Sequence, residues 1–262
     1  MSLNHYESFH SEFTEACRKG NLELVQNLIY DVSTYDYASY DAIAYNHAFE
    51  NGHLNVIKYL VESRIDFYAN NDDALLLASE NGNLNIVKYL VEIGTDIHAY
   101  NKIPLLFASD NGHLDVVKYL VELGADNHFD NDYAFRLASA NGHFDVVKYL
   151  VELGADIHAK NEYALICASV NGHLSVVKYL IESGADIHAD NDYALRVASE
   201  NGNLDVVKYL VESGADIHAK YDLAPILASK NGHFNIVKYL IDSRTKNSAL
   251  NVALGSASKK DI

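Results

Sequence analysis

The chain has 262 residues, of which 49% are hydrophobic and 21% are charged, so it carries enough apolar material for a buried core and is not a disordered chain. Its 36 acidic and 20 basic side chains give a net charge of −16, which repels phosphate backbones and anionic lipids. The charge therefore argues against nucleic acid and membrane surfaces as partners, and the 2 Pro and 14 Gly argue against collagen-like or linker architectures.

The cysteine content and the N-terminus indicate the compartment. Cys17 and Cys167 are too few for a disulfide framework, and no Asn-x-Ser/Thr acceptor occurs. Residues 1–20 lack the apolar run of a signal peptide, and charges interrupt every later apolar stretch well before the ~20 residues that a membrane span requires. We therefore expect an intracellular protein, in the cytoplasm or a host cytoplasm, with no signal peptide or transmembrane segment.

The chain is built from a repeat of 30 residues. The pair Asn-Gly recurs at this interval from Asn51-Gly52 to Asn231-Gly232, and a degenerate copy at residues 19–22 stands 32 residues before the first of these. The spacing predicts a single array over residues 1–262. We expect a degenerate capping repeat in residues 1–31, seven repeats in residues 32–244, and a half-repeat cap with a frayed tail in residues 245–262.

Residues 132–154 illustrate one repeat. Ala134, Leu137 and Ala138 stand at helical offsets, and the small side chains of Ala138 and Ser139 allow close backbone approach. After the Asn141-Gly142 turn, an apolar stripe runs along a second short helix. It consists of Phe144, Val147, Leu150 and Val151. Gly154 ends this helix where a left-handed cap is needed, as do Gly94, Gly124, Gly184 and Gly214. Each repeat is therefore predicted to be two short antiparallel helices and a connector.

Repeats of this size must stack. A helix of eight or nine residues is shorter than the ~12–15 residues needed for marginal stability alone, so each pair must bury its stripe against the next. The predicted fold class is an all-α solenoid with one thin continuous core. Its specificity must come from positions that differ between repeats.

The repeated residues resemble the ankyrin repeat. GADIHA, a connector, a short helix, NGHLDVVKYLVE and a further GAD follow each other over nearly the whole chain. The unit is 30 residues rather than about 33, and the TPLH box is mostly replaced, as by Tyr163–Ala168 and Tyr193–Ala198. This variant is similar to ankyrin arrays of giant amoeba-infecting DNA viruses. The resemblance implies blunt connecting fingers, with Asp132, Glu162, Asp192 and Asp222 near the first-helix start accepting backbone N–H bonds in place of the family's Thr.

Motifs for metal or catalysis are weak. Asp-x-His recurs once per repeat, as at Asp156/His158 and Asp186/His188, but adjacent copies lie about 10 Å apart and a metal needs three or four converging ligands. The turn residues His53, His113 and His173 recur in the same structural manner. No P-loop, G-x-G-x-x-G, H-E-x-x-H or G-x-S-x-G string occurs. We expect no metal, no cofactor and no enzymatic activity.

The uniform Lys-Tyr pair, such as Lys148-Tyr149 and Lys178-Tyr179, is interpreted as scaffold, with each Tyr leaning on the next second helix and Lys reaching solvent. The variable positions lie at the connector and on the exposed side of the first helix, the surface by which ankyrin proteins hold partners. The candidate partner-binding residues are Asp132, Tyr133, Arg136, Glu162, Tyr163, Ile166, Asp192, Tyr193 and Arg196. They fall within a rim of acidic tips formed by Asp72, Asp130, Asp132, Glu162, Asp190, Asp192 and Asp222.

These residues have a structural alternative. Asp132–Arg136 and Asp192–Arg196 are also spaced as simple i,i+4 helix pairs, and the Tyr rings are also suited to filling space left by the shortened finger. The favoured function is a monomeric, non-enzymatic scaffold that binds a protein with a basic patch on its concave acidic face. The alternative is a structural, self-associating array without a dedicated partner.

Overall fold

The computed structural model describes residues 3–31, 41–63 and 71–244, and all regular elements in this part of the chain are helices. The chain divides into two compact units, residues 1–126 and 127–262. The single array predicted for 1–262 stays a prediction, as do the bounds of its capping repeats. The predicted half-repeat in residues 245–262 lies outside the described residues.

Both units consist of paired helices. In the first unit the helices are α1 (Leu3–Lys19), α2 (Leu22–Asp31), α3 (Asp41–Glu50), α4 (Leu54–Glu62), α5 (Asn71–Glu80), α6 (Leu84–Glu92), α7 (Ala99–Asp110) and α8 (Leu114–Glu122). In the second unit they are α9 (Phe129–Ala140), α10 (Phe144–Glu152), α11 (Ala159–Asn171), α12 (Leu174–Glu182), α13 (Ala189–Glu200), α14 (Leu204–Glu212), α15 (Ala219–Lys230) and a helix over 234–244.

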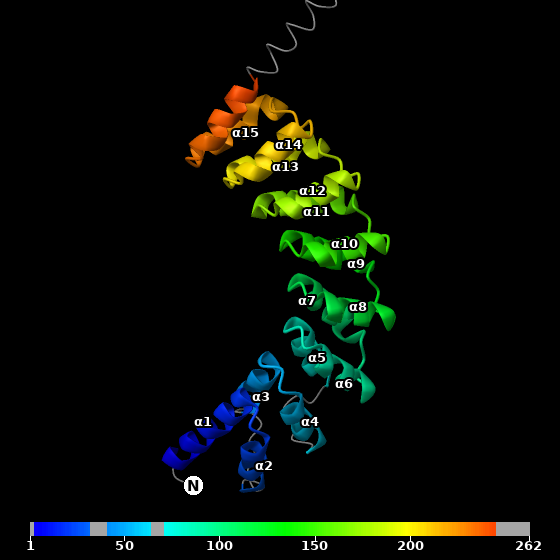
Figure 1. The fold of residues 1–262 in the computed structure, drawn as a ribbon, viewed down its shortest axis with the longest axis vertical. Coiled ribbons are helices and arrows are strands. Elements are labelled where there is room, and N and C mark those ends of the chain that lie inside the picture. The colour runs from blue at the N-terminus through cyan, green and yellow to red at the C-terminus, as the bar shows by residue number, and fades with distance from the viewer. Residues whose placement is uncertain (1–2, 32–40, 64–70, 245–262) are drawn as a thin grey trace, which may run out of the picture. The chain divides into compact units, whose positions relative to one another are not determined.

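The pairs stack in sequence order. Within the second unit, α9, α11, α13 and α15 pack side by side as the row of first helices, and each of α9, α11 and α13 also packs on its own second helix (Figure 1). The second helices α10, α12 and α14 form a second row, each in contact with the next. Because each pair contacts only its neighbours, the architecture within this unit is the predicted all-α solenoid.

The buried faces differ slightly from the predicted stripes. In α10, Val146, Val147 and Leu150 are buried, whereas Phe144 and Val151 are only half-buried. In α9 the buried face includes Phe135 and Ser139, whereas the predicted Leu137 is half-buried. In α9, which contacts α11 as well as its partner α10, the buried face is wider than a single stripe. In α10 the buried face is instead shifted toward Val146.

Glycine forms both turns of a repeat. Gly142 has φ +77° between the helices and Gly154 has φ +94° after the second, in the left-handed region that favours glycine. The prediction that Gly154 and its equivalents cap the second helix is confirmed. Asn141, in contrast, has φ −99°, so only the glycine of the Asn-Gly pair uses a positive φ.

The residue after each Asn-Gly pair ties one repeat to the preceding one. His173 Nε2 donates to the carbonyl oxygen of Ala140 at 3.0 Å, and Asn203 Nδ2 donates to the carbonyl oxygen of Val170 at 2.7 Å. These acceptors lie near the end of the preceding first helix, where carbonyls have no partner within the helix. The turn histidines are therefore structural, and asparagine substitutes because it also carries a donor of suitable reach.

The Lys-Tyr pair forms a second ladder between repeats. Lys178 Nζ lies 5.4 Å from the ring centroid of Tyr209 in the next repeat, and Lys58 Nζ lies 5.0 Å from that of Tyr89. These are cation–π distances. The lysine of one repeat thus covers the tyrosine of the next, which supports a scaffold role. The predicted direction of the tyrosine contact is wrong, since Tyr179 packs on Phe144 of the preceding second helix, with ring centroids 5.6 Å apart.

The first repeat has the expected core. Phe13, Ala16 and Cys17 of α1 and Val25 of α2 are buried. Neither Cys17 nor the half-buried Cys167 takes part in a disulfide. The degenerate sequence therefore retains the apolar positions of a repeat.

Candidate partner-binding site

The connectors of the second unit end in an unusual turn. Each of α9, α11, α13 and α15 begins with three consecutive residues of positive φ, and a right-handed helix follows. In α9 these are Asp130, Asn131 and Asp132, with φ between 46° and 57°. Asn and Asp tolerate the left-handed region better than most residues. With this single turn and no strand in residues 127–244, the connectors are blunt fingers, as predicted.

Two buried arginines hold this turn. Arg136 donates to the carbonyl oxygens of Asp130 at 2.7 Å and Asn131 at 3.0 Å, and Arg196 makes the corresponding bonds to Asp190 and Asn191 at 2.7 and 3.2 Å. Each guanidinium also reaches the Oδ2 atom of its aspartate, at 3.4 and 3.3 Å. Arg136 and Arg196 thus pair with the aspartate six residues earlier, Asp130 and Asp190. The i,i+4 pairs with Asp132 and Asp192 that the sequence suggested are not formed.

The third residue of the turn is a buried carboxylate. Asp132 accepts from His128 Nδ1 at 2.7 Å and from the backbone N–H of Asp156 in the next repeat at 3.1 Å. Asp192 accepts from His188 Nδ1 at 2.9 Å and from the N–H of Asp216 at 2.8 Å. Both carboxylates therefore accept a backbone N–H hydrogen bond, as predicted. The donor, however, belongs to the next repeat and not to the residue's own helix.

Burial overturns part of the predicted surface. Asp132, Glu162 and Asp192 are only 5%, 4% and 4% exposed, so the prediction that they stand at solvent-facing tips is wrong. Arg136 and Arg196 are equally buried, at 4% and 5%. Their charges are used inside the array because unpaired charges are costly away from water. The side chain of Asp72 lies outside the described residues.

Glu162 departs from the aspartates. Its Oε1 atom is bonded to His158 Nδ1 at 2.5 Å, but Oε2 is buried without a partner, because the longer side chain does not repeat the backbone bond of Asp132 and Asp192. The hydrogen bond and the negative charge of Glu162 raise the pKa of His158 above its usual 6.5. Glu162 therefore favours the protonated form of this imidazole.

This pair predicts a pH effect. Since the folded pKa of His158 is raised, the stabilisation by the pair is complete below pH ~6.5 and is lost as the pH rises through the folded pKa. Glu162→Gln is expected to lower the pKa of His158 in an NMR titration. Glu152→Gln, which changes an exposed carboxylate of the preceding helix, serves as the control and is expected to leave that pKa unchanged. An unaltered His158 titration in Glu162→Gln would show that the pair is not the cause.

Charges at the exposed finger tips alternate in sign. Lys160 Nζ lies 3.2 Å from Asp130 Oδ1, and Lys220 Nζ lies 3.4 Å from Asp190 Oδ1, each pair joining two successive repeats. The hydrogen bonds from these lysines lower the pKa of Asp130 and of Asp190. All four side chains are well exposed, so the pairs add little stability. They do, however, leave the tips of this unit alternating rather than uniformly acidic.

The tyrosines lie on these arginines. The Arg136 guanidinium carbon is 4.8 Å from the ring centroid of Tyr133 and 5.5 Å from that of Tyr163, and the Arg196 carbon is 4.6 Å from that of Tyr193. Tyr163 remains 45% exposed. Tyr133, Tyr193 and Ile166 are half-buried. The three tyrosines thus occupy equivalent positions on successive first helices, each against a buried arginine, and Ile166 lies one turn after Tyr163 on α11.

The sequence reasoning missed the supporting role of the arginines. The available signal was the combination of Asp130, Arg136 and Lys160, which recurs 60 residues later as Asp190, Arg196 and Lys220. The joint recurrence after two repeats indicates that the three side chains act together, as their contacts in the structure do.

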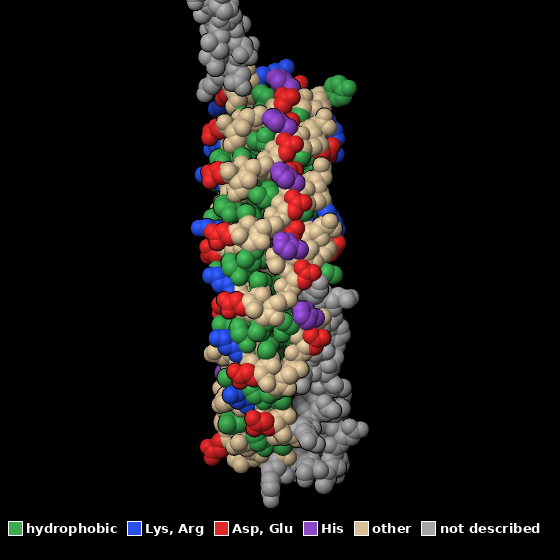
Figure 2. Space-filling view, turned by 90° about the vertical axis from the view of Figure 1, so that its right-hand side faces the viewer, with side chains coloured by type: hydrophobic (Ala, Val, Ile, Leu, Met, Phe, Trp, Pro, Cys, Tyr) green, Lys and Arg blue, Asp and Glu red, His purple; other side chains and the backbone are tan. Residues whose placement is uncertain are grey.

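The connector histidines form a column. Within residues 127–244 their imidazoles alternate with carboxylates down the face that Figure 2 shows. Each Nδ1 atom is bonded to the carboxylate four residues later. In the part of the chain that the structure describes, no group of three or more His, Cys, Asp or Glu side chains is placed to hold a metal ion.

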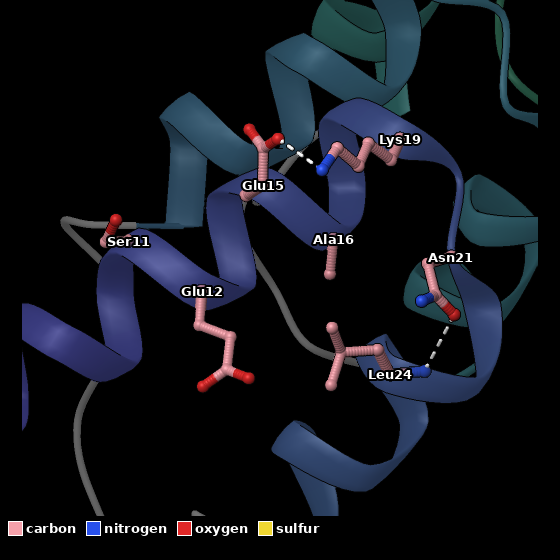
Figure 3. A pocket seen from close by; sticks show the side chains of 7 residues that line it. All are labelled: Ser11, Glu12, Glu15, Ala16, Lys19, Asn21 and Leu24. Carbon is pink, nitrogen blue, oxygen red and sulfur yellow. Dashed lines mark hydrogen bonds and ion pairs between the residues drawn. The ribbon is translucent and has the colours of Figure 1, made fainter.

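A hollow lies between α1 and α2, lined by Glu12, Glu15, Lys19, Asn21 and Leu24 among others (Figure 3). Arg18 and Lys19 pair with Glu15 at 2.6 and 2.9 Å, and the hydrogen bonds lower its pKa to about 2. Asn21 Oδ1 accepts the backbone N–H of Leu24, as a helix cap does. These polar groups are engaged in helix ends and surface ion pairs, which gives the hollow no evident chemistry.

No helix among the described residues has the length and apolar character needed to cross a bilayer. A comparison with curated proteins gave no match. A family model for ankyrin repeats, comprising three copies, matches residues 13–101, 67–132, 95–161 and 135–221. These overlapping matches cover most of the chain and coincide with the stacked helical pairs. The chain therefore belongs to the ankyrin repeat family.

Proposed function

We propose that this protein is a non-enzymatic scaffold that holds another protein on the first-helix and finger face of residues 127–244. Ankyrin repeats generally mediate protein–protein interaction, and the family is typically non-enzymatic. The observation that carries the proposal is Tyr163, which is exposed yet fixed against the buried Arg136. An aromatic ring already held in place loses little conformational entropy on docking.

The contacting residues we propose are Tyr133, Tyr163, Ile166 and Tyr193. Asp132, Glu162, Asp192, Arg136 and Arg196 act beneath this surface, so they affect binding by positioning the turn and the rings. Charge reversal of the three carboxylates would therefore test folding rather than recognition. Because the exposed tip charges alternate, recognition on this face is expected to rest on the aromatic and aliphatic side chains.

The proposal is tested with a partner captured from expressing cells and then purified. Tyr163→Ala is expected to weaken its binding about 30-fold, the effect of losing a central aromatic anchor. Phe234→Ala, which removes a 71% exposed aromatic ring from the row of second helices, is the matched control and is expected to leave the dissociation constant unchanged. Both variants are checked for unaltered thermal unfolding. Equal binding by Tyr163→Ala and the unmodified chain would contradict this face.

The alternative of a self-associating array is separated by sedimentation of the purified chain. A monomeric scaffold gives a mass that does not depend on concentration. A mass that rises with concentration would favour a structural role instead.

A further inference from the structure

A groove separates the first turns of α13 and α15 in the second unit. It has a volume of about 670 Å³ and is lined by His188, Asp190, Asp216, His218, Lys220 and Tyr221 among others. We refer to it as the Tyr221 groove. Its lining residues come from the fingers of two successive repeats.

Tyr221 breaks the pattern of the turn. The middle residue is Asn131, Asn161 and Asn191 in the three preceding repeats, whereas here a tyrosine with φ +63° occupies the position. Its side chain is 95% exposed, so the ring contributes nothing to the core. A large aromatic residue in this backbone region costs more than asparagine, and a fully exposed ring beside a groove is characteristic of a contact surface.

The charges around the ring favour a cation. Asp190, Asp192 and Asp216 line the groove, and Asp192 is buried with its bonds to His188 and the Asp216 N–H filled. Asp190 is shared by Lys220 and Arg196. Asp216 is exposed and accepts the backbone N–H of His218 through Oδ1. Asp190 and Asp192 are thus each paired with a nitrogen-bearing side chain, whereas Asp216 has no cationic side chain paired with it among the described residues.

A planar guanidinium fits this arrangement best. It stacks on a tyrosine ring and forms bidentate bonds with a carboxylate, which a lysine ammonium does less well. The fold already uses such contacts, since Arg136 lies 4.8 Å from the centroid of Tyr133 and Arg196 lies 4.6 Å from that of Tyr193. We propose that the Tyr221 groove receives an arginine side chain of the protein partner, stacked on Tyr221 and paired with Asp216. This inference rests on the proposed function, because it presupposes a protein partner.

The test uses the full chain and the probe acetyl-Gly-Arg-Gly-amide, with the citrulline peptide as its neutral counterpart. In NMR titrations the arginine peptide is expected to shift the amide signals of residues 188–190 and 216–221. The citrulline peptide is expected to bind at least about tenfold more weakly, because it keeps the shape of the guanidinium but lacks the charge. Equal shifts by both peptides would overturn the inference.

Variants locate the contact. Tyr221→Asn restores the residue of the preceding repeats, so it should fold at least as well, and it is expected to weaken arginine-peptide binding about tenfold. Asp216→Asn is expected to weaken it similarly. Asp186→Asn, the same position one repeat earlier, is the control and should have no effect. An equal loss of affinity in Asp186→Asn, or no loss in Tyr221→Asn, would show that the peptide is attracted by the acidic protein in general. Either result would contradict an arginine site in the Tyr221 groove.

The two proposals fail in different ways. If the arginine peptide misses the groove while Tyr163→Ala still releases the partner, the groove inference is wrong and the proposed function stands. If the peptide binds at Tyr221 while partner binding ignores Tyr163, the groove stands and the first-helix face is wrong.

Discussion

Replacing Gly142 by alanine is expected to destabilise the second unit by roughly 2–5 kcal/mol. Two causes add. The backbone has φ +77°, which costs an L-residue with a Cβ about 1–2 kcal/mol. A Cβ at this position would also overlap the imidazole of His173 from the next repeat, and such overpacking costs about 1–3 kcal/mol. Urea unfolding followed by circular dichroism measures the loss.

Gly232 supplies the matched control. Its φ of +79° is nearly the same, but no described atom lies within 4 Å of the Cβ that alanine would add. Gly232→Ala is therefore expected to cost only the backbone strain, about 1–2 kcal/mol. In a His173→Ala background, the cost of Gly142→Ala should fall to the same value. Equal losses in both single variants would show that the His173 contact has no energetic role.

Replacing Asp192 by alanine is the second large change. It is expected to lower the free energy of unfolding by about 2–4 kcal/mol, because the N–H of Asp216 loses its acceptor and His188 loses its carboxylate partner. The estimate stays below that for a fully buried ion pair because the His188 side chain is 58% exposed. Thermal and urea unfolding of the purified variant provide the measurement.

Asp190→Ala is its control in the same turn. Asp190 is exposed and its partners Arg196 and Lys220 remain solvated or bonded to backbone, so a much smaller loss is expected. Comparing the two losses of stability distinguishes the buried Asp192 from the exposed Asp190, which stand only two residues apart in the sequence. A loss for Asp190→Ala as large as that for Asp192→Ala would contradict the role assigned to the buried carboxylate.

Much of the fold follows from local sequence. The paired helices can be located from the 30-residue interval, the Asn-Gly turn and the glycine after the second helix. Each of these signals depends only on the backbone conformation within one repeat. The buried face was harder to place. The sequence predicted Leu137 as a buried residue of α9, but Phe135 is buried and Leu137 only half-buried. An apolar stripe describes contact with a single neighbouring helix, whereas α9 packs on two.

The candidate site was only partly predictable. Tyr133, Tyr163 and Tyr193 were recognised from their variation between repeats, and they do occupy equivalent positions on successive first helices. The acidic residues beside them could not be told apart in the sequence, since Asp130 and Asp132 are the same residue type on either side of Asn131. Their fates diverge because a left-handed turn points Asp132 at the N–H of Asp156 in the next repeat and leaves Asp130 at the tip.

The sequence by itself determined that this protein is a stack of short helical pairs, because the repeat period and its glycines encode conformations that each repeat needs on its own. Only the tertiary structure decided which charges face solvent and which join repeats. Asp132 and Asp192 are buried against backbone N–H groups 24 residues away in the next repeat. The arginines Arg136 and Arg196 are buried against the left-handed turn of their own repeat. Glu162 is buried at the equivalent position of the turn between them. Solvent exposure is a property of the assembled stack, so no pattern within one repeat contains it.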